Sequence, residues 1–182
     1  MSSLAAIAAA VIVAVALAPG SAAAEPQLSL IDDFSGENSS LGTRWEGFTD
    51  RVMGGVSQLE TRIEGSGPET VLHLTGEVSL RNNGGFIQVR LPLVPGGKPF
   101  DASGYTGIAL RVRGRDSGYY VHLRTTRTVF PWSLYAQGFS VTAQWSTVYL
   151  PFNAFGSENM ARSELDPRKL LSVALVAAKR EF

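Results

Sequence analysis

Apolar and polar residues alternate with a period of two along most of the chain after residue 25, which is typical of β-strands with one buried face. In the segment 71–80, for example, Leu72, Leu74 and Leu80 fall on one face, whereas His73 and Thr75 fall on the other. The predicted strands are residues 28–34, 56–63, 71–80, 86–91, 108–112, 119–123, 133–141, 145–150 and 171–177.

Turn signals separate these strands. Gly65-Ser66-Gly67-Pro68 is a turn, and Asn83-Gly84 between two alternating runs predicts a β-hairpin. Asp166-Pro167 predicts the start of a short helical turn before the last strand. Short strands at this spacing, with almost no helical periodicity, predict an all-β sandwich or barrel of antiparallel sheets.

The N-terminus resembles a targeting segment. Residues 4–18 are apolar and rich in alanine, and Ala22-x-Ala24 is a small-residue cleavage pattern, so we expect a signal peptide over residues 1–24. The protein would then be exported, periplasmic or secreted, with residues 25–182 as one domain. No Lys or Arg precedes the apolar run, and an uncleaved N-terminal anchor is the alternative. The run is short for a membrane span, so none is expected after cleavage.

Composition narrows the function. The chain has 16 basic and 16 acidic residues, so it carries no net positive charge that would suggest nucleic acid as a partner. Acidic residues predominate from Glu25 to Leu80 and basic residues from Arg81 to Arg127, which predicts a local basic patch. The absence of cysteine excludes disulfides and thiolate chemistry.

Catalytic signals are few. The two histidines, His73 and His122, lie on predicted strands with apolar neighbours, and no hydrolase, metalloprotease or phosphate-binding motif is present. Asp32-Asp33 could contribute oxygen ligands to calcium, but adjacent carboxylates at a strand end are usually only solvated. We therefore expect no enzyme, no metal and no cofactor.

A binding surface is better supported. If the strands neighbour one another, the polar sides of several of them form a row of guanidinium and amide groups: Gln88, Arg90, Arg111, Arg113, His122 and Arg124. Aromatic side chains could add flat surfaces beside this row: Tyr120, Trp132, Tyr135 and Phe139. Such a face suits sugars, carboxylates or a protein partner, and the alternative is an ordinary solvated sheet face.

Two glycine pairs organise the chain. Gly54-Gly55 lies in the stretch 44–57, and Gly84-Gly85 lies in Asn82-Asn83-Gly84-Gly85-Phe86. Each pair precedes a predicted strand, so it is either a tight turn or a surface shaped for a partner. Asp50 and Ser57 are expected to cap the backbone around the first pair, since both side chains bond readily to nearby amides.

These motifs resemble the complex I intermediate-associated protein 30 family. The resemblance rests on Val52-Met53-Gly54-Gly55-Val56-Ser57 with Trp45 and Asp50, and on Asn82 to Phe86. Further matches are Tyr105-x-Gly107-Ile108, Leu110 to Gly114, Tyr120-x-His122-Leu123-Arg124, Trp145, Leu150-Pro151-Phe152 and Phe155.

The resemblance implies a galactose-binding-like jelly-roll β-sandwich and an assembly factor for NADH:ubiquinone oxidoreductase. The leader contains no arginine, unlike a mitochondrial transit peptide, and this departs from the mitochondrial members. The family usually continues into a final strand after the position of residues 179–182, so the resemblance also implies that the sequence is truncated there.

The sequence therefore predicts a non-catalytic domain that binds a protein partner, for which a respiratory-complex intermediate is the candidate. The alternative is a carbohydrate-binding module that binds a glycan. A hydrolase of unknown substrate is the third hypothesis. The predicted motif surface is Trp45, Asp50, Met53, Gly54, Gly55, Ser57, Asn82, Asn83, Gly84, Gly85 and Phe86. The predicted sheet-face site is Arg111, His122, Arg124 and Tyr135.

Overall fold

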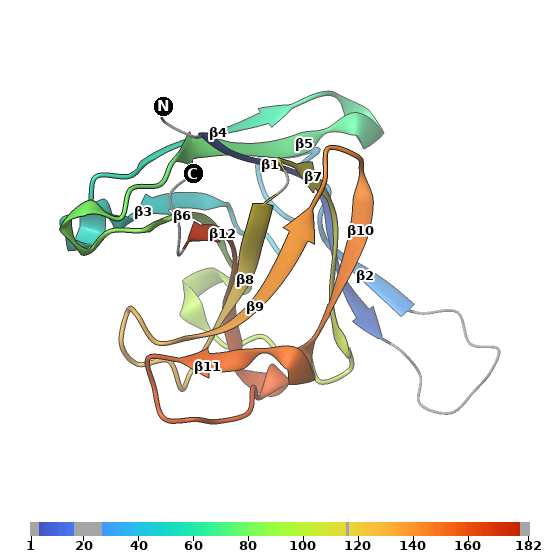
Figure 1. Cartoon of the computed structure of the whole chain (residues 1–182). Coiled ribbons are helices and arrows are strands. Elements are labelled where there is room, and N and C mark those ends of the chain that lie inside the picture. The colour runs from blue at the N-terminus through green and yellow to red at the C-terminus, as the bar shows by residue number, and fades with distance from the viewer. Residues whose placement is uncertain (1–3, 17–26, 116, 179–182) are drawn as a thin grey trace.

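The described residues form two six-stranded antiparallel sheets, which are joined by short 3-10 turns and loops (Figure 1). The structure, a computed structural model, describes residues 4–16, 27–115 and 117–178. No α-helix occurs within these ranges, and they contain no helix long and apolar enough to cross a membrane. The predicted all-β sandwich of antiparallel sheets is confirmed.

The first sheet has the strand order β10-β7-β1-β5-β4, with β2 paired to β1. Its strands are β1 (Leu4–Ala16), β2 (Gln27–Asp32), β4 (Gln58–Glu64), β5 (Val71–Glu77), β7 (Gly107–Gly114) and β10 (Ser146–Pro151).

The second sheet has the order β11-β9-β8-β12-β6-β3. Its strands are β3 (Glu46–Thr49), β6 (Phe86–Pro92), β8 (Ser117–Thr125), β9 (Leu134–Val141), β11 (Gly156–Glu158) and β12 (Leu170–Ala178). The 3-10 turns are η1 (Asp50–Met53), η2 (Gly67–Glu69), η3 (Arg81–Asn83), η4 (Pro95–Gly97), η5 (Phe152–Ala154) and η6 (Pro167–Lys169).

The core lies between the two sheets, as the alternation predicts. Leu74 of β5, Ile87 of β6, Leu110 of β7 and Leu123 of β8 are almost completely buried there. Burying a side chain of this size contributes about 1.5–3 kcal/mol of hydrophobic free energy. A domain without disulfides is held together by this burial and by its strand ladders.

Residues 4–16, predicted to belong to a leader, form β1 in the middle of the first sheet. Ala8 pairs with His73 of β5 on one side and with Arg113 of β7 on the other. The predicted cleavage before Glu25 stays a prediction, because residues 17–26 lie outside the described residues, as do residues 179–182 at the predicted point of truncation.

The predicted hairpin at Asn83-Gly84 is wrong. β5 pairs with β1 and β4, whereas β6 pairs with β3 and β12, so the intervening turn carries the chain from one sheet to the other. Asn82 takes the left-handed conformation, with φ of 56°. Leu80 is also misplaced by the alternation: β5 ends at Glu77, and the Leu80 side chain is exposed.

The predicted turn before the last strand is confirmed. The Asp166 side chain accepts a hydrogen bond from the Arg168 amide, and Pro167 is the first residue of η6. The proline fixes a helical φ at a position whose amide would have no partner in the turn. This turn sets the start of β12, the strand on which the candidate site is centred.

Candidate functional site

Asp50 binds the two glycine motifs together. Its side chain is completely buried and accepts hydrogen bonds from the Ser57 amide (3.0 Å), the Ser57 hydroxyl and the Gly85 amide (2.7 Å), with a longer one from Phe86 (3.4 Å). The Ser57 hydroxyl oxygen in turn accepts from the Ser79 amide (3.0 Å). One carboxylate therefore fixes segments that lie more than 30 residues apart in the sequence, and the predicted capping role is confirmed.

The glycines make room for this carboxylate. A Cβ atom at Gly55 would lie 2.3 Å from the Asp50 carboxyl, and one at Gly84 would lie 2.5 Å from Asp50 Oδ2. Gly54 is required for another reason, because its φ of 90° belongs to the left-handed region. The double glycines are therefore explained by close packing on a buried anion.

Hydrogen bonding also sets the charge state of Asp50. Burial opposes ionisation, but the Ser57 hydroxyl and the amides of Gly85, Ser57 and Phe86 outweigh it, so the pKa of Asp50 lies below its ordinary value of 3.8. The carboxylate is thus ionised at neutral pH, when it can accept all of these hydrogen bonds.

This lowered pKa predicts an acid-dependent loss of stability. The stabilisation is fully present above the unfolded-state value of 3.8 and is lost as the pH falls through the lower folded-state pKa. Urea unfolding between neutral pH and about pH 2 should show the loss in the native chain and a smaller loss in Asp50→Asn. Equal pH dependence of the two proteins would contradict the assignment.

We call the unit in which Asp50 and Ser57 join residues 50–57 to residues 79–86 the clamp, and this clamp presents apolar side chains to solvent. Asp50 to Ser57 and Ser79 to Gly85 form two turns that project together at one end of the molecule (Figure 1). Val52 and Met53 of the first turn and Leu80 of the second are exposed, and Met53 shows 53% of its surface. We call Val52, Met53 and Leu80 the clamp rim.

Beside the clamp rim lies the outward face of the second sheet. Strand register defines one row across it: Glu46, Arg90, Ala174, His122 and Ala136. The next row is Phe48, Gln88, Val176, Tyr120 and Gly138. Because β12 contributes only small or short side chains, the centre of the face is lower than its polar flanks.

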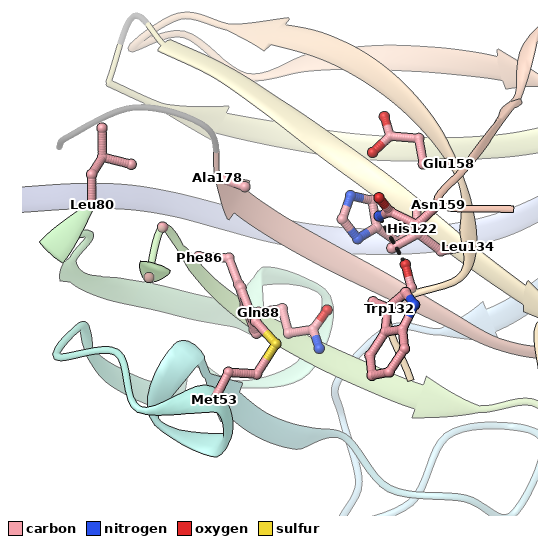
Figure 2. Close-up of a pocket in the computed structure, with 12 residues that line it drawn as sticks. Met53, Leu80, Phe86, Gln88, His122, Trp132, Leu134, Glu158, Asn159 and Ala178 are labelled. Atoms are coloured by element: carbon pink, nitrogen blue, oxygen red, sulfur yellow. Dashed lines mark hydrogen bonds between the residues drawn. The ribbon is translucent and has the colours of Figure 1, made fainter. Parts of the chain in front are cut away.

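An open hollow of about 290 Å³ lies on this face (Figure 2). Met53 and Leu80 line it from the clamp rim, Phe86 and Gln88 from β6, and His122 from β8. Trp132, Leu134, Glu158 and Asn159 close the opposite side, and Ala178 and the two glycines 84 and 85 complete the lining. The hollow therefore connects the glycine motifs with the sheet face.

A loop forms the opposite wall. Arg124 donates from Nη2 to the carbonyls of Thr128 (2.7 Å) and Phe130 (3.1 Å), and Asn159 donates to the Trp132 carbonyl (3.0 Å; Figure 2). The loop exposes Val129, Phe130 and Trp132, and the last two rings stack in parallel with centroids 5.4 Å apart. We call Val129, Phe130 and Trp132 the loop rim.

Residues 33–181 match the complex I intermediate-associated protein 30 family. The chain belongs to this family. The match covers the clamp, the sheet face and the loop rim, and the comparison with curated proteins found no match.

Two solved structures have a fold similar to that of this family member. A family 11 carbohydrate-binding module of a cellulosomal cellulase from Clostridium thermocellum superposes with a TM-score of 0.58 at 14% identity, covering 79% of this chain and 89% of that one. A second structure, of the Clostridium thermocellum module in complex with a mixed-linked tetrasaccharide, gives 0.56 at 13% identity, covering 75% and 81%. At such identities the likeness shows the fold alone.

Three of the predicted binding residues of this family member lie elsewhere. Tyr135 is buried in the core, where its hydroxyl bonds to Ser163 (2.8 Å), so its predicted place on the sheet face is wrong. Arg111 lies on β7 of the other sheet, and therefore does not join the row with His122 and Arg124. Trp45 packs on Phe34 and donates to Asp32 Oδ2 (2.9 Å), away from the hollow.

The other predicted residues divide by role. Met53, Gly84, Gly85 and Phe86 of the predicted motif surface line the hollow together with His122 of the predicted sheet-face site. The remaining predicted residues either build the clamp or support its walls: Asp50, Gly54, Gly55, Ser57, Asn82, Asn83 and Arg124. Two aromatic expectations also separate, since Tyr120 flanks the face whereas Phe139 is buried.

Sequence reasoning missed most of the rims. Leu80 was assigned to the core, and Val129 and Phe130 fall in a segment without periodicity. The signal available for Val129 to Trp132 is a run of large apolar residues in a predicted loop, where polar residues are the norm. Arg113, predicted in the same row, instead lies on β7 with its guanidinium 4.9 Å from the Trp145 ring.

The hollow offers little for catalysis. It holds one histidine, His122, and one carboxylate, Glu158, but its described lining includes no serine, threonine, cysteine, lysine or second carboxylate. A glycosidase needs two carboxyl groups, and covalent catalysis needs a nucleophile beside its base.

The residues that the structure describes contain no group of three or more His, Cys, Asp and Glu that could hold a metal ion. The carboxylates of Asp32 and Asp33, which were candidate calcium ligands, accept hydrogen bonds from neighbouring residues instead. Asp32 accepts from Phe34 and Trp45, and Asp33 accepts from Ser35, which holds the pKa of Asp33 below its ordinary value.

Proposed function

We propose that this chain is an exported, non-catalytic binding domain that holds a segment of a protein partner in the hollow between the clamp rim and the loop rim. The observation that carries the proposal is that exposed apolar side chains line one hollow from both sides, Met53 and Leu80 from the clamp rim and Trp132 from the loop rim. Monomeric proteins rarely expose large apolar patches without a binding role. The family to which the chain belongs is named for association with an intermediate of complex I, and this supports an assembly role.

The chemistry of the rims favours a protein over a glycan. Four of the six rim side chains are aliphatic or thioether groups: Val52, Met53, Leu80 and Val129. Such groups bury apolar side chains of a partner, whereas sugars are bound mainly against flat aromatic rings. Methionine is also adaptable, which suits an extended or variable segment.

The test is a binding experiment with the full chain as bait on periplasmic and membrane extracts, followed by affinity measurement with the purified captured protein. Met53→Ala/Trp132→Ala should weaken binding about 30-fold or more, since both are anchor-type side chains and both are already exposed in the free protein. The matched control is Arg111→Ala/Arg113→Ala on the other sheet, which should bind as the native chain does. A captured protein that binds both variants equally would contradict the proposal.

A glycan is the second candidate, since the two solved structures are carbohydrate-binding modules and Trp132 exposes 53% of its surface beside the hollow. Titration with mixed-linked β-glucan oligosaccharides decides between the two. If calorimetry gives a saturable binding heat with the native chain that is lost in Trp132→Ala but kept in Met53→Ala, the ligand is a glycan and not a protein segment.

A further inference from the structure

Two arginines lie next to the hollow with little negative charge to balance them. Arg90 of β6 and His122 of β8 flank Ala174 in one row, and Arg124 lies one row further along, opposite Ser172 of β12. Alanine and serine between the two guanidinium-bearing strands leave the space above β12 open. The arginines therefore flank the same low strip of the face.

Arg90 is only partly satisfied. Its Nη2 donates to Glu46 (3.0 Å), and its guanidinium carbon lies 4.4 Å from the centre of the Phe48 ring. Its Nε is buried and makes no hydrogen bond to any residue that the structure describes. The Arg90 side chain as a whole still exposes 31% of its surface, so a ligand can approach the guanidinium group from solvent.

Arg124 has no carboxylate partner among the described residues. Its donors reach two carbonyls and, from Nε (3.3 Å), the Thr128 hydroxyl, all of which are neutral acceptors. Burial, and then the positive charge of Arg90, lower the pKa of Arg124 below its ordinary value. The two cations thus interact electrostatically, and Glu46 is paired with one of them only.

We propose that Arg90 and Arg124 form an anion subsite that receives the carboxylate of an acidic side chain in the bound protein segment. A guanidinium group presents donors in a planar fork that matches a carboxylate, and such charge-assisted bonds are the stronger ones. A carboxylate above Ala174 would balance the positive charge of Arg124, because Glu46 is already paired with Arg90. The subsite rests on the proposed function for its protein occupant, whose apolar side chains would fill the neighbouring hollow.

The experiment uses the full chain labelled with ¹⁵N-arginine and follows the guanidinium Nε–Hε signals by NMR. N-acetyl-glutamate amide is the probe, and N-acetyl-glutamine amide is its neutral counterpart. The carboxylate probe should shift the Arg90 and Arg124 signals saturably, and the neutral probe should not. Arg113, an exposed arginine of the other sheet, is the internal control. No saturable shift, or the same shift with the neutral probe or at Arg113, would overturn the subsite.

Two variants test the pair. Arg90→Gln should weaken binding of the carboxylate probe at least tenfold, and Arg90→Lys should restore part of it, while the thermal unfolding midpoint reports whether the fold is kept. Glucuronate and glucose form a further arm: glucuronate binding tenfold tighter than the glutamate derivative would overturn the choice of a protein carboxylate. If the carboxylate probe does not bind but Met53→Ala/Trp132→Ala still loses the partner, the subsite is wrong and the proposed function stands. If the probe binds at Arg90 and Arg124 but Met53→Ala/Trp132→Ala keeps the partner, the proposed function is wrong and the anion subsite stands.

Discussion

A chain that begins at Glu25 is expected not to unfold as one cooperative unit. β1 lies between β5 and β7, and removing it leaves β5 paired only with β4 and β7 only with β10, so each has an unpaired edge in the middle of the sheet. The unpaired backbone groups of β5 and β7 are expected to cost a large part of the margin of about 5–15 kcal/mol by which a domain is stable. The measurement is urea unfolding of the full chain and of the shorter chain, with light scattering to detect association of the open strand edges.

A synthetic peptide of residues 4–16, with lysines added for solubility, provides the control for this experiment. Added to the shorter chain, it should restore cooperative unfolding by pairing between β5 and β7, whereas a peptide of the same composition in scrambled order should not. A shorter chain that unfolds at the same urea concentration as the full chain would show that β1 is dispensable. The predicted cleavage before Glu25 and this sheet are compatible only if another extended segment takes the place of β1.

Asp50→Ala is expected to produce the second large effect. The substitution leaves the buried donors of Ser57, Gly85 and Phe86 without an acceptor, at a cost of roughly 3 kcal/mol or more in the free energy of unfolding. Because the clamp also holds Met53 and Leu80 in place, partner binding should weaken as well. Urea unfolding at neutral pH measures the first effect, and the binding assay with the captured protein measures the second.

Asp101→Ala is the matched control for Asp50→Ala. Asp101 also accepts a hydrogen bond from a backbone amide, that of Ser103 (2.9 Å), but it lies exposed in a loop, so its loss should change stability by less than about 0.5 kcal/mol. The loss of stability in Asp50→Asn should fall between those of Asp50→Ala and Asp101→Ala. The asparagine oxygen can still accept a hydrogen bond, but its NH2 group places donors opposite the donors of the buried amides. Equal stability of Asp50→Ala and Asp101→Ala would contradict the clamp.

Local chemistry made some features predictable. Alternation identified the strands and their buried faces, because a period of two is imposed by the pleat wherever one face is buried. Capping by Asp50 and Ser57 was predictable for a similar reason, since aspartate and serine beside glycines bond to nearby amides. The family resemblance followed from the same motifs, and the match over residues 33–181 confirms it.

The errors share a cause, which is that the sequence does not state which strands are neighbours. Arg111 and Arg124 both alternate outward, but they lie on different sheets, and only the register places Arg90 with Arg124. Tyr135 was assigned to the outward face, yet the phase of β9 turns it into the core. A hairpin was predicted at Asn83-Gly84 because turn chemistry is local, whereas the crossing between sheets depends on partners far along the chain.

The sequence by itself determined the fold class, most of the strands, the closely packed glycine motifs and the family. Only the tertiary structure decided that a buried carboxylate joins the two motifs, that two apolar rims face each other across one sheet, and that residues 4–16 lie between β5 and β7. The physical reason is that alternation and turn preference arise between residues close in the chain. The clamp, the hollow and the arginine pair arise from non-local strand pairing, which the register fixes and the local pattern does not contain.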